Sequence, residues 1–391
     1  MHWEIFSEEI FGYSAEIEAG KLKVLKKVKD KAFAVRVIEN GKLGFSAGRD
    51  LDKTIEAARK IARISEEKID EFPVEKPAKV EGLYDSRFKN LDGEFIKEEF
   101  ERLLSAVEKA KIASAVISHE MVKVELRNSS GAELEELGTF SFFSIETVFN
   151  DGSGFAQTQS RKMELEIEET AIYAEELALK SAGAEKIESG YYDVILMPQA
   201  VHQLFSHTLY PSLSAENVAR GRSRLYTGME LGKIRILDDA TVPYGFASYS
   251  FDDEGVMARR KVLIDGKVVG FYSDWKNSKK FGLTGNGLRM NIDSPPVPMP
   301  SNIVIELDEK VDESGALVIH NIIGAHTANF ISGDFSVETL NAEFKGKAVK
   351  GAMIYGNIFD LLGKVQGFLS NAIQIENTIT PAIRFGEVRI V

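Results

Sequence analysis

The first part of the chain combines patterns typical of strands with patterns typical of helices. Residues 32–38 alternate as in a strand, and Asn40-Gly41 follows, which predicts a hairpin with a type I′ turn because both turn residues need positive φ. A helix is predicted to begin after Asp50, a suitable N-cap residue. Its apolar stripe recurs at helical spacing, at Leu51, Ile55, Ala58 and Ala62.

A second set of elements follows the connector 72–77, whose two prolines predict an extended and exposed segment at a domain boundary. A helix is predicted over 95–113. The strand-like pattern of 116–160, with turn residues at 128–131 and 151–154, predicts an antiparallel meander. Another helix is predicted over 163–182, with the glutamates near its start on a solvated face. The apolar face of the 95–113 helix would comprise Ile96, Phe100, Leu103, Val107 and Ala110.

Strand patterns dominate after residue 190. A buried strand over 192–197 ends at Pro198, and a short helix is predicted to stop at Pro211. Asp265-Gly266 predicts a hairpin turn, and the proline-rich stretch 293–300 excludes a central strand because proline lacks an N–H group. Later predictions are strands at 303–307, 316–323 and on both sides of Lys345-Gly346, a helix over 357–368, and a closing strand over 383–390.

These patterns predict an α+β protein of three parts. An N-terminal α/β subdomain (1–75) and a middle α/β subdomain (76–190) would pack helices on antiparallel sheet. A β-rich C-terminal domain (191–391) would carry few short helices and most of the candidate chemistry.

The composition removes several classes of function. The 391 residues include no cysteine, so disulfides, thiolate nucleophiles and cysteine-bound metals are excluded. The net charge of −12 disfavours binding to nucleic acid. The first residues lack the pattern of a secretory signal, and no apolar run approaches the roughly 18–20 residues of a membrane span, so we expect a cytoplasmic protein.

Two histidines, His202 and His207, form the first candidate metal site. Their spacing of five residues separates them by about 140° on a regular helix. Gln203 stands where metallopeptidases carry a general-base glutamate, and an amide cannot relay a proton. A second pair, His320 and His326, could complete such a site, but a structural role is the alternative for both pairs. His2 and His119 are isolated in the sequence.

Three other clusters carry weaker indications. Arg220, Arg222 and Arg224 could grip a carboxylate or phosphate, or pair with nearby acids. The segment Thr284-Gly285-Asn286-Gly287 lacks the third glycine of a dinucleotide fingerprint. The acidic run 252–254 could bind a cation, although an acidic turn before a strand is the more common explanation.

Several blocks together resemble the TldD/PmbA family, also called modulator of DNA gyrase. The resemblance covers nearly the whole chain and implies an intracellular metallopeptidase system that acts on unfolded or small peptides and works as pairs of related subunits. The blocks are Phe251-Asp252-Asp253-Glu254-Gly255-Val256, Thr284-Gly285-Asn286, Ile331-Ser332-Gly333-Asp334-Phe335-Ser336 and Ile354-Tyr355-Gly356-Asn357.

Within that family the chain resembles the PmbA/TldE-type branch. The TldD branch is expected to hold its metal with H-E-x-x-x-H and a later cysteine. Here the motif reads His202-Gln203-x-x-x-His207, and the segment 370–373 has no cysteine. The resemblance therefore implies a non-catalytic or regulatory subunit, in which the His202/His207 pair is vestigial and Gln203 is not a catalytic residue. It further implies that the chain has no cofactor of its own and that a TldD-type partner supplies zinc.

Two alternatives remain open at this point. The chain could be a metal-dependent peptidase in its own right, using zinc bound by His202 and His207. It could also be a stand-alone peptide-binding protein, because a β-rich domain can accept a peptide as an added strand. A homodimer is compatible with each of them.

Overall fold

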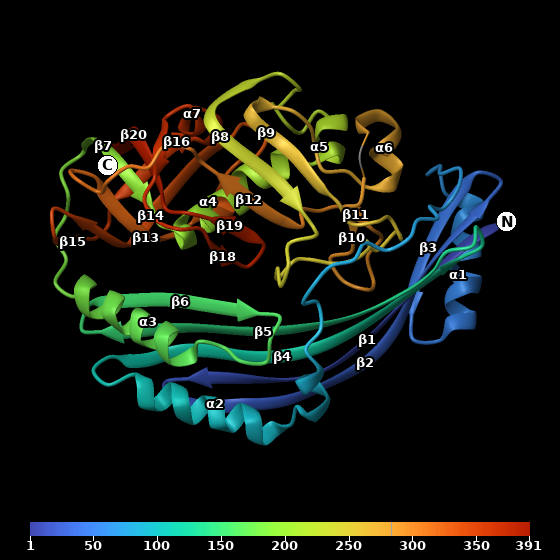
Figure 1. Ribbon diagram of the computed structural model, residues 1–391, viewed down its shortest axis with the longest axis horizontal. Helices are drawn as coiled ribbons and strands as arrows, with labels where there is room; N and C mark the ends of the chain where they lie inside the picture. Colours follow the sequence, from blue (N-terminus) through green and yellow to red (C-terminus); the bar gives the residue numbers. More distant parts are fainter. Residues whose placement is uncertain (283) are drawn as a thin grey trace.

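A long antiparallel sheet forms one layer of the molecule, and a β-rich C-terminal region lies against one of its faces (Figure 1). This computed structural model describes residues 1–282 and 284–391. The architecture confirms the predicted α+β class, with helices on antiparallel sheet in the N-terminal half and few short helices in a β-rich remainder.

The N-terminal sheet has the strand order β3-β2-β1-β4-β5-β6, so residues on both sides of position 75 share it. The predicted boundary at 75 therefore does not separate two sheets, whereas all the described strands from Gly190 onward belong to other sheets, in agreement with a boundary at 190. The hairpin between β2 and β3 is confirmed, with positive φ at Asn40 (54°) and Gly41 (76°). The strands of the N-terminal sheet are β1 (His2–Glu18), β2 (Lys21–Glu39), β3 (Lys42–Gly48), β4 (Lys111–Asn128), β5 (Glu133–Phe149) and β6 (Gly152–Ser160).

Three helices cover the face of this sheet that points away from the C-terminal region (Figure 1). Helix α1 (Leu51–Ile64) begins as predicted, with the Asp50 side chain accepting a hydrogen bond from the Lys53 N–H group. Helix α2 (Gly93–Ala106) ends seven residues before the predicted limit, because residues from Lys111 onward pair as β4 with β5. Helix α3 (Ile167–Ser181) starts four residues later than predicted. A short 3₁₀ helix, η1, covers Ser86–Asn90.

The C-terminal region contains three further sheets around a large core. The seven-stranded sheet comprises β7 (Gly190–Leu196), β13 (Leu317–Ile323), β14 (Asp334–Phe344), β15 (Lys347–Val349), β16 (Met353–Asn357), β17 (Val365–Phe368) and β20 (Ile383–Ile390). The five-stranded sheet comprises β8 (Glu230–Asp239), β9 (Arg260–Val268), β12 (Asn302–Glu306), β18 (Ile373–Ile375) and β19 (Thr378–Thr380). The third pairs β10 (Gly287–Leu288) with β11 (Val297–Pro298). The helices are α4 (Pro198–Ser212), α5 (Ala215–Ala219), α6 (Trp275–Phe281), α7 (Ile358–Leu362) and the 3₁₀ turn η2 (Ala325–Thr327).

Two local predictions in this region have different outcomes. The chain does turn at Asp265-Gly266, where Gly266 has a positive φ (65°) and the Leu263 carbonyl accepts hydrogen bonds from the N–H groups of Val269 and Gly270 at 2.8 and 3.2 Å, although the strand β9 is continuous through the turn and its register with β8 is irregular. The helix predicted over 357–368 covers only Ile358–Leu362, because Gly363 caps it and the following residues pair with β20 as β17.

The connector 72–77 has no regular structure, as predicted, but its beginning is not exposed. Phe72 is 2 % exposed and lies under the guanidinium of Arg36, whose carbon is 5.2 Å from the ring centroid. The adjacent Glu71 carbonyl accepts a hydrogen bond from the Trp275 indole N–H group. Phe72 and Pro73 are buried because the chain crosses the junction of the two layers here, which the sequence pattern does not reveal, whereas Val74, Lys76 and Pro77 are exposed as predicted.

A buried ion triad joins the N-terminal sheet to the C-terminal region. Arg36 on β2 donates to both carboxylate oxygens of Glu4 on β1, at 2.8 and 2.9 Å, and to Glu254 at 2.6 Å. All three side chains are at most 3 % exposed. The two carboxylates hold the pKa of Arg36 above its ordinary value despite burial, so the guanidinium stays charged.

Among the described residues, no helix is both long and apolar enough to cross a bilayer.

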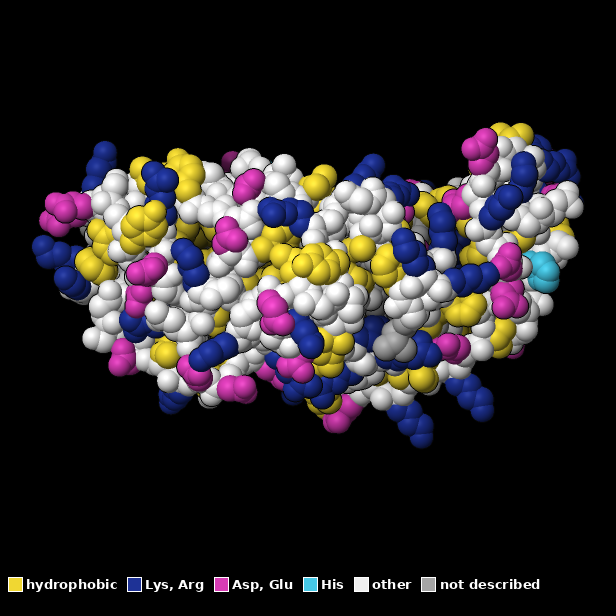
Figure 2. All heavy atoms as spheres, turned by 90° about the horizontal axis from the view of Figure 1, so that it is seen from above, with side chains coloured by type: hydrophobic (Ala, Val, Ile, Leu, Met, Phe, Trp, Pro, Cys, Tyr) yellow, Lys and Arg dark blue, Asp and Glu magenta, His cyan; other side chains and the backbone are white. Residues whose placement is uncertain are grey.

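The face seen in Figure 2 carries acidic and basic side chains interspersed with apolar ones. Exposed ion pairs between such side chains contribute little to stability.

Replacing Arg36 with methionine should strongly destabilise the protein. The change leaves Glu254 buried without a cation and leaves Glu4 with only the Arg289 guanidinium, 4.0 Å away, which costs about 3–5 kcal/mol of the free energy of unfolding. Urea denaturation of purified protein measures the loss. Arg49→Met is the matched control, because it removes an exposed arginine–aspartate pair with Asp30 and should leave the midpoint unchanged. Equal midpoints for R36M and wild type would contradict the prediction.

Candidate functional site

His202 lies on α4, where the helix packs against the β18–β19 hairpin. The strand β7 ends at Leu196 and α4 begins at Pro198, a residue that suits the first helical position because it needs no N–H partner. The helix runs to Ser212, one residue beyond the predicted stop at Pro211. His202 is buried, and its Nδ1 is 2.9 Å from the Thr378 hydroxyl, which also bonds the hydroxyl of Tyr210 at 2.8 Å. This series of hydrogen bonds fixes the orientation of the imidazole ring.

Glu376 faces the other nitrogen of His202. It stands in the turn between β18 and β19 with a left-handed φ of 49°, a conformation that costs a non-glycine residue free energy. Its Oε2 is 3.6 Å from His202 Nε2, and Gln157 on β6 donates to its Oε1 at 3.3 Å. The interaction with His202 lowers the pKa of Glu376, so this carboxylate is ionised at neutral pH. The pair lies where the edge of the N-terminal sheet meets the C-terminal region.

His207 lies on a different side of α4 and is exposed. Partial burial, followed by the nearby imidazoles of His326 and His202, lowers its pKa from the ordinary value, and the carboxylate of Glu376 opposes this shift. His326 at η2, His202 and Glu376 thus all lie near enough to His207 to affect its titration, although the spacing of five residues places His202 and His207 on different sides of the helix.

Gln203 is engaged in the packing of α4 on the seven-stranded sheet. Strand β13 pairs with β7 only as far as Ile319, because the chain leaves β7 to begin α4. The backbone N–H group of Ile322 lies beyond this ladder, and it donates a 2.8 Å hydrogen bond to Gln203 Oε1. The oxygen that would belong to a general base is therefore a structural acceptor.

The donor set does not fit a catalytic metal ion. In the part of the chain that the structure describes, no three His, Asp or Glu side chains are arranged to hold one metal. Nδ1 of His202 and the side-chain oxygen of Gln203 already have protein partners. No catalytic step is therefore derived through a metal held by this chain, and metal binding by His202 and His207 stays a prediction.

His320 belongs to a separate environment from His326. It lies on β13 and bonds the hydroxyl of Tyr173 on α3, with 2.7 Å between Nδ1 and the oxygen. Burial raises the pKa of Tyr173 to about 12, and burial next to Lys180 lowers the pKa of His320. At neutral pH the neutral imidazole of His320 therefore accepts a hydrogen bond from the Tyr173 hydroxyl, which is a structural role.

Comparison with known proteins gives this site its family context. Residues 189–391 match the PmbA/TldA metallopeptidase C-terminal domain, residues 3–62 match domain 1 and residues 65–182 match the central domain of the same family. The chain belongs to the PmbA/TldD family. The resemblance seen in the sequence blocks is confirmed.

Individual relatives agree with the family assignment. An uncharacterized protein of Methanocaldococcus jannaschii is 32 % identical over 90 % of this chain and 88 % of its own length. A metalloprotease of Archaeoglobus fulgidus is 28 % identical over 80 % of this chain and 77 % of its own length. The crystal structure of TldE from Thermococcus kodakarensis has the same fold, with a TM-score of 0.89 over 100 % of this chain and 96 % of that one at 22 % identity.

Of the remaining sequence candidates, four have structural partners: Arg220, Arg224, Asn286 and the acidic run 252–254. Arg220 pairs with Glu216 on the same short helix at 2.6 Å, and Arg224 donates to the Ser332 carbonyl. Asn286 bonds the buried Asp238 at 2.9 Å, so this family block supports the core and does not form a nucleotide loop. In the acidic run 252–254, the carboxylates accept from backbone N–H groups and from Arg36.

Sequence reasoning missed Glu376 and Thr378, the two residues that surround His202. The available signal was a short polar turn, Glu376-Asn377, between two short apolar runs. Nothing local indicates that this turn reaches α4, because 174 residues separate Glu376 from His202 in the chain.

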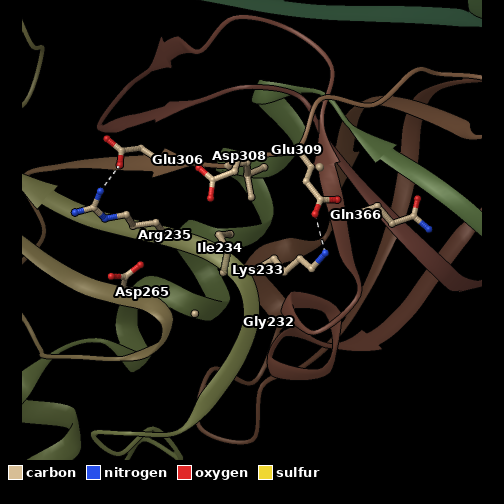
Figure 3. Close-up of a pocket in the computed structure, with 12 residues that line it drawn as sticks. Gly232, Lys233, Ile234, Arg235, Asp265, Glu306, Asp308, Glu309 and Gln366 are labelled. Carbon is tan, nitrogen blue, oxygen red and sulfur yellow. Dashed lines mark hydrogen bonds and ion pairs between the residues drawn. The ribbon is translucent and has the colours of Figure 1, made fainter.

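A cavity of about 550 Å³ lies on the outer side of β8, β9 and β12, and none of its lining residues belongs to the histidine site (Figure 3). Figure 3 shows Arg235 directed at Glu306 and Lys233 directed at Glu309. These pairs, 3.2 and 2.7 Å long, use both basic side chains of the cavity. Its solvated charges carry no indication of a reaction centre.

The titration of His207 tests the geometry of this site. NMR of the imidazole signals should give a pKa for His207 below the usual 6.5. His326→Gln should raise this pKa because it removes a nearby positive charge, and Glu376→Gln should lower it further. His320→Gln serves as the control and should change nothing. A His207 pKa above 6.5 in the wild type would show that the imidazoles and Glu376 are arranged otherwise.

Proposed function

We propose that the chain is a non-catalytic or regulatory subunit of a TldD/TldE-type metallopeptidase complex. In this role it pairs with a TldD-type catalytic chain in the cytoplasm, and the complex acts on unfolded or small peptides. The partner supplies the metal and the general base. The single observation that carries the proposal is the hydrogen bond from the Ile322 N–H group to Gln203. The side chain at the expected general-base position is an amide whose oxygen already accepts from the backbone of β13.

The surroundings of His202 support the same proposal. Its Nδ1 is bound by Thr378, and its Nε2 faces an ionised carboxylate at 3.6 Å. With no cysteine in the chain, the third ligand expected for the TldD branch is absent. The fold shared with TldE of Thermococcus kodakarensis agrees with a place in the PmbA/TldE-type branch.

A second candidate function rests on Glu376. A carboxylate close to His202, with His207 on the same helix, gives two imidazoles and one acid from which a zinc site could be assembled if the side chains rearranged. The chain would then be a metal-dependent peptidase in its own right. Metal analysis of protein purified without chelators separates the two proposals, because about one equivalent of zinc that is lost in His202→Ala is expected only from the second.

The proposed partnership predicts a specific pattern of peptidase activity. An unstructured fluorogenic peptide should stay intact with this chain alone, even with zinc present, and should be cleaved when a TldD-type chain from the same cell is added. The two chains should also co-purify. Cleavage by this chain alone that disappears in His202→Ala would overturn the proposal. Co-purification without turnover would favour a stand-alone peptide-binding role.

The general-base position can be tested directly by restoring a glutamate. Gln203→Glu should leave the fold intact, because a carboxylate also accepts from the Ile322 N–H group, and should create no activity in the isolated chain. Gln203→Leu removes the acceptor and should cost about 1 kcal/mol of the free energy of unfolding. Urea denaturation and the same peptide assay measure both effects. Activity gained by Q203E alone would contradict the structural role of this residue.

A further inference from the structure

A pocket between the N-terminal sheet and the C-terminal region lies apart from the histidine site. Its volume is about 300 Å³, at the small end of the range of ligand sites. Figure 1 shows β3 and α1 on one side of this junction and α5, α6 and β11 on the other. Its apolar lining comes from both layers and comprises Leu43, Phe45, Ile61, Ile69, Pro295, Pro296 and Val297.

All but one of the charged side chains that line the pocket are paired with one another. Arg36 bonds Glu254 at 2.6 Å, and Arg220 bonds Glu216 at the same distance. Lys276 bonds Glu67. These three pairs use every basic side chain of the lining and leave one acid, Asp274, without a cation.

Asp274 is buried, and its hydrogen bonds come from neutral groups of one neighbouring residue. Its side chain caps α6, with Oδ1 accepting from the backbone and the side-chain N–H groups of Asn277 at 2.9 and 2.7 Å. The residue is 5 % exposed, and no basic side chain of the described residues lies within 4 Å of it. Burial, with Glu254 nearby, raises the pKa of Asp274 to about 6. Above pH 6 it is therefore a buried anion in a pocket whose other charged side chains are paired with one another.

We propose that this pocket binds a small organic cation, a primary amine with a short apolar arm, through an ion pair with Asp274. A buried carboxylate is costly unless a cation is paired with it, and an ammonium group supplies both the charge and the hydrogen-bond donors. The apolar walls would enclose the arm of the ligand. The volume corresponds to a molecule of roughly the size of one or two amino-acid residues.

The binding test uses three probes that share one apolar arm. Isoamylamine, 3-methyl-1-butanol and isovalerate differ only in a positive, neutral or negative head group. Isothermal titration of the purified chain at pH 7.5 should show the amine binding at least ten times more tightly than the alcohol, and the carboxylate not at all. Methylamine, which lacks the arm, should bind at least ten times more weakly than isoamylamine.

Two variants assign the binding to this pocket. Asp274→Asn keeps an oxygen for the Asn277 N–H groups but removes the charge, and should reduce amine affinity at least tenfold. Ile61→Lys introduces a cation at a lining position that is 42 % exposed, so the variant should fold and should also lose amine binding. Asp92→Asn is the matched control, because it changes another aspartate cap, at the start of α2, outside the pocket.

Three results would overturn the proposal. Equal affinity for the amine and the alcohol would indicate an apolar cavity without recognition of charge. Preference for isovalerate would mean that the basic side chains, and not Asp274, govern the pocket. Amine binding that survives Asp274→Asn would locate the cation elsewhere. None of these results depends on a TldD-type partner, so the test is independent of the proposed function.

Discussion

Arg36 brings a full positive charge into the junction of two β layers, and the fold depends on how that charge is matched. Glu4 on the neighbouring strand and Glu254 in the C-terminal region both form ion pairs with this guanidinium. Because removing one partner would leave a buried charge unpaired, the layers are held in one relative position. Glu254 also accepts the Trp275 N–H group, so the same triad fixes the start of α6 and the carboxylate of Asp274 beside it.

The histidine site lies at the other end of the same junction, where β6 meets the β18–β19 hairpin. Gln157 reaches from the sheet edge to Glu376, and Glu376 faces His202. Gln203, the next residue on α4, completes the backbone hydrogen bonding of β13. One side of α4 thus supports the packing of the sheet, while the imidazole of His202 lies beside a carboxylate.

Sequence patterns predicted the elements that have strong local signals. The Asn40-Gly41 hairpin, the Asp50 cap and the closing strand agree with the structure, because turn, cap and alternation are short-range effects. The long strand β1 was not predicted, since its face toward the C-terminal region carries polar residues such as Glu8 and hides the alternation. The helix predicted over 95–113 was too long because pairing of β4 on both sides outweighs helical spacing.

The chemistry of the site divides in the same way. By itself the sequence determined the family, the lack of a cysteine ligand and the amide at position 203, because these are matters of residue identity and spacing. Only the tertiary structure decided that Glu376 and Thr378 lie beside His202, that His326 lies near His207, and that Asp274 is left without a cation. Such juxtapositions depend on which distant segments pack together, and a buried charge acquires its meaning only from the groups that packing places around it.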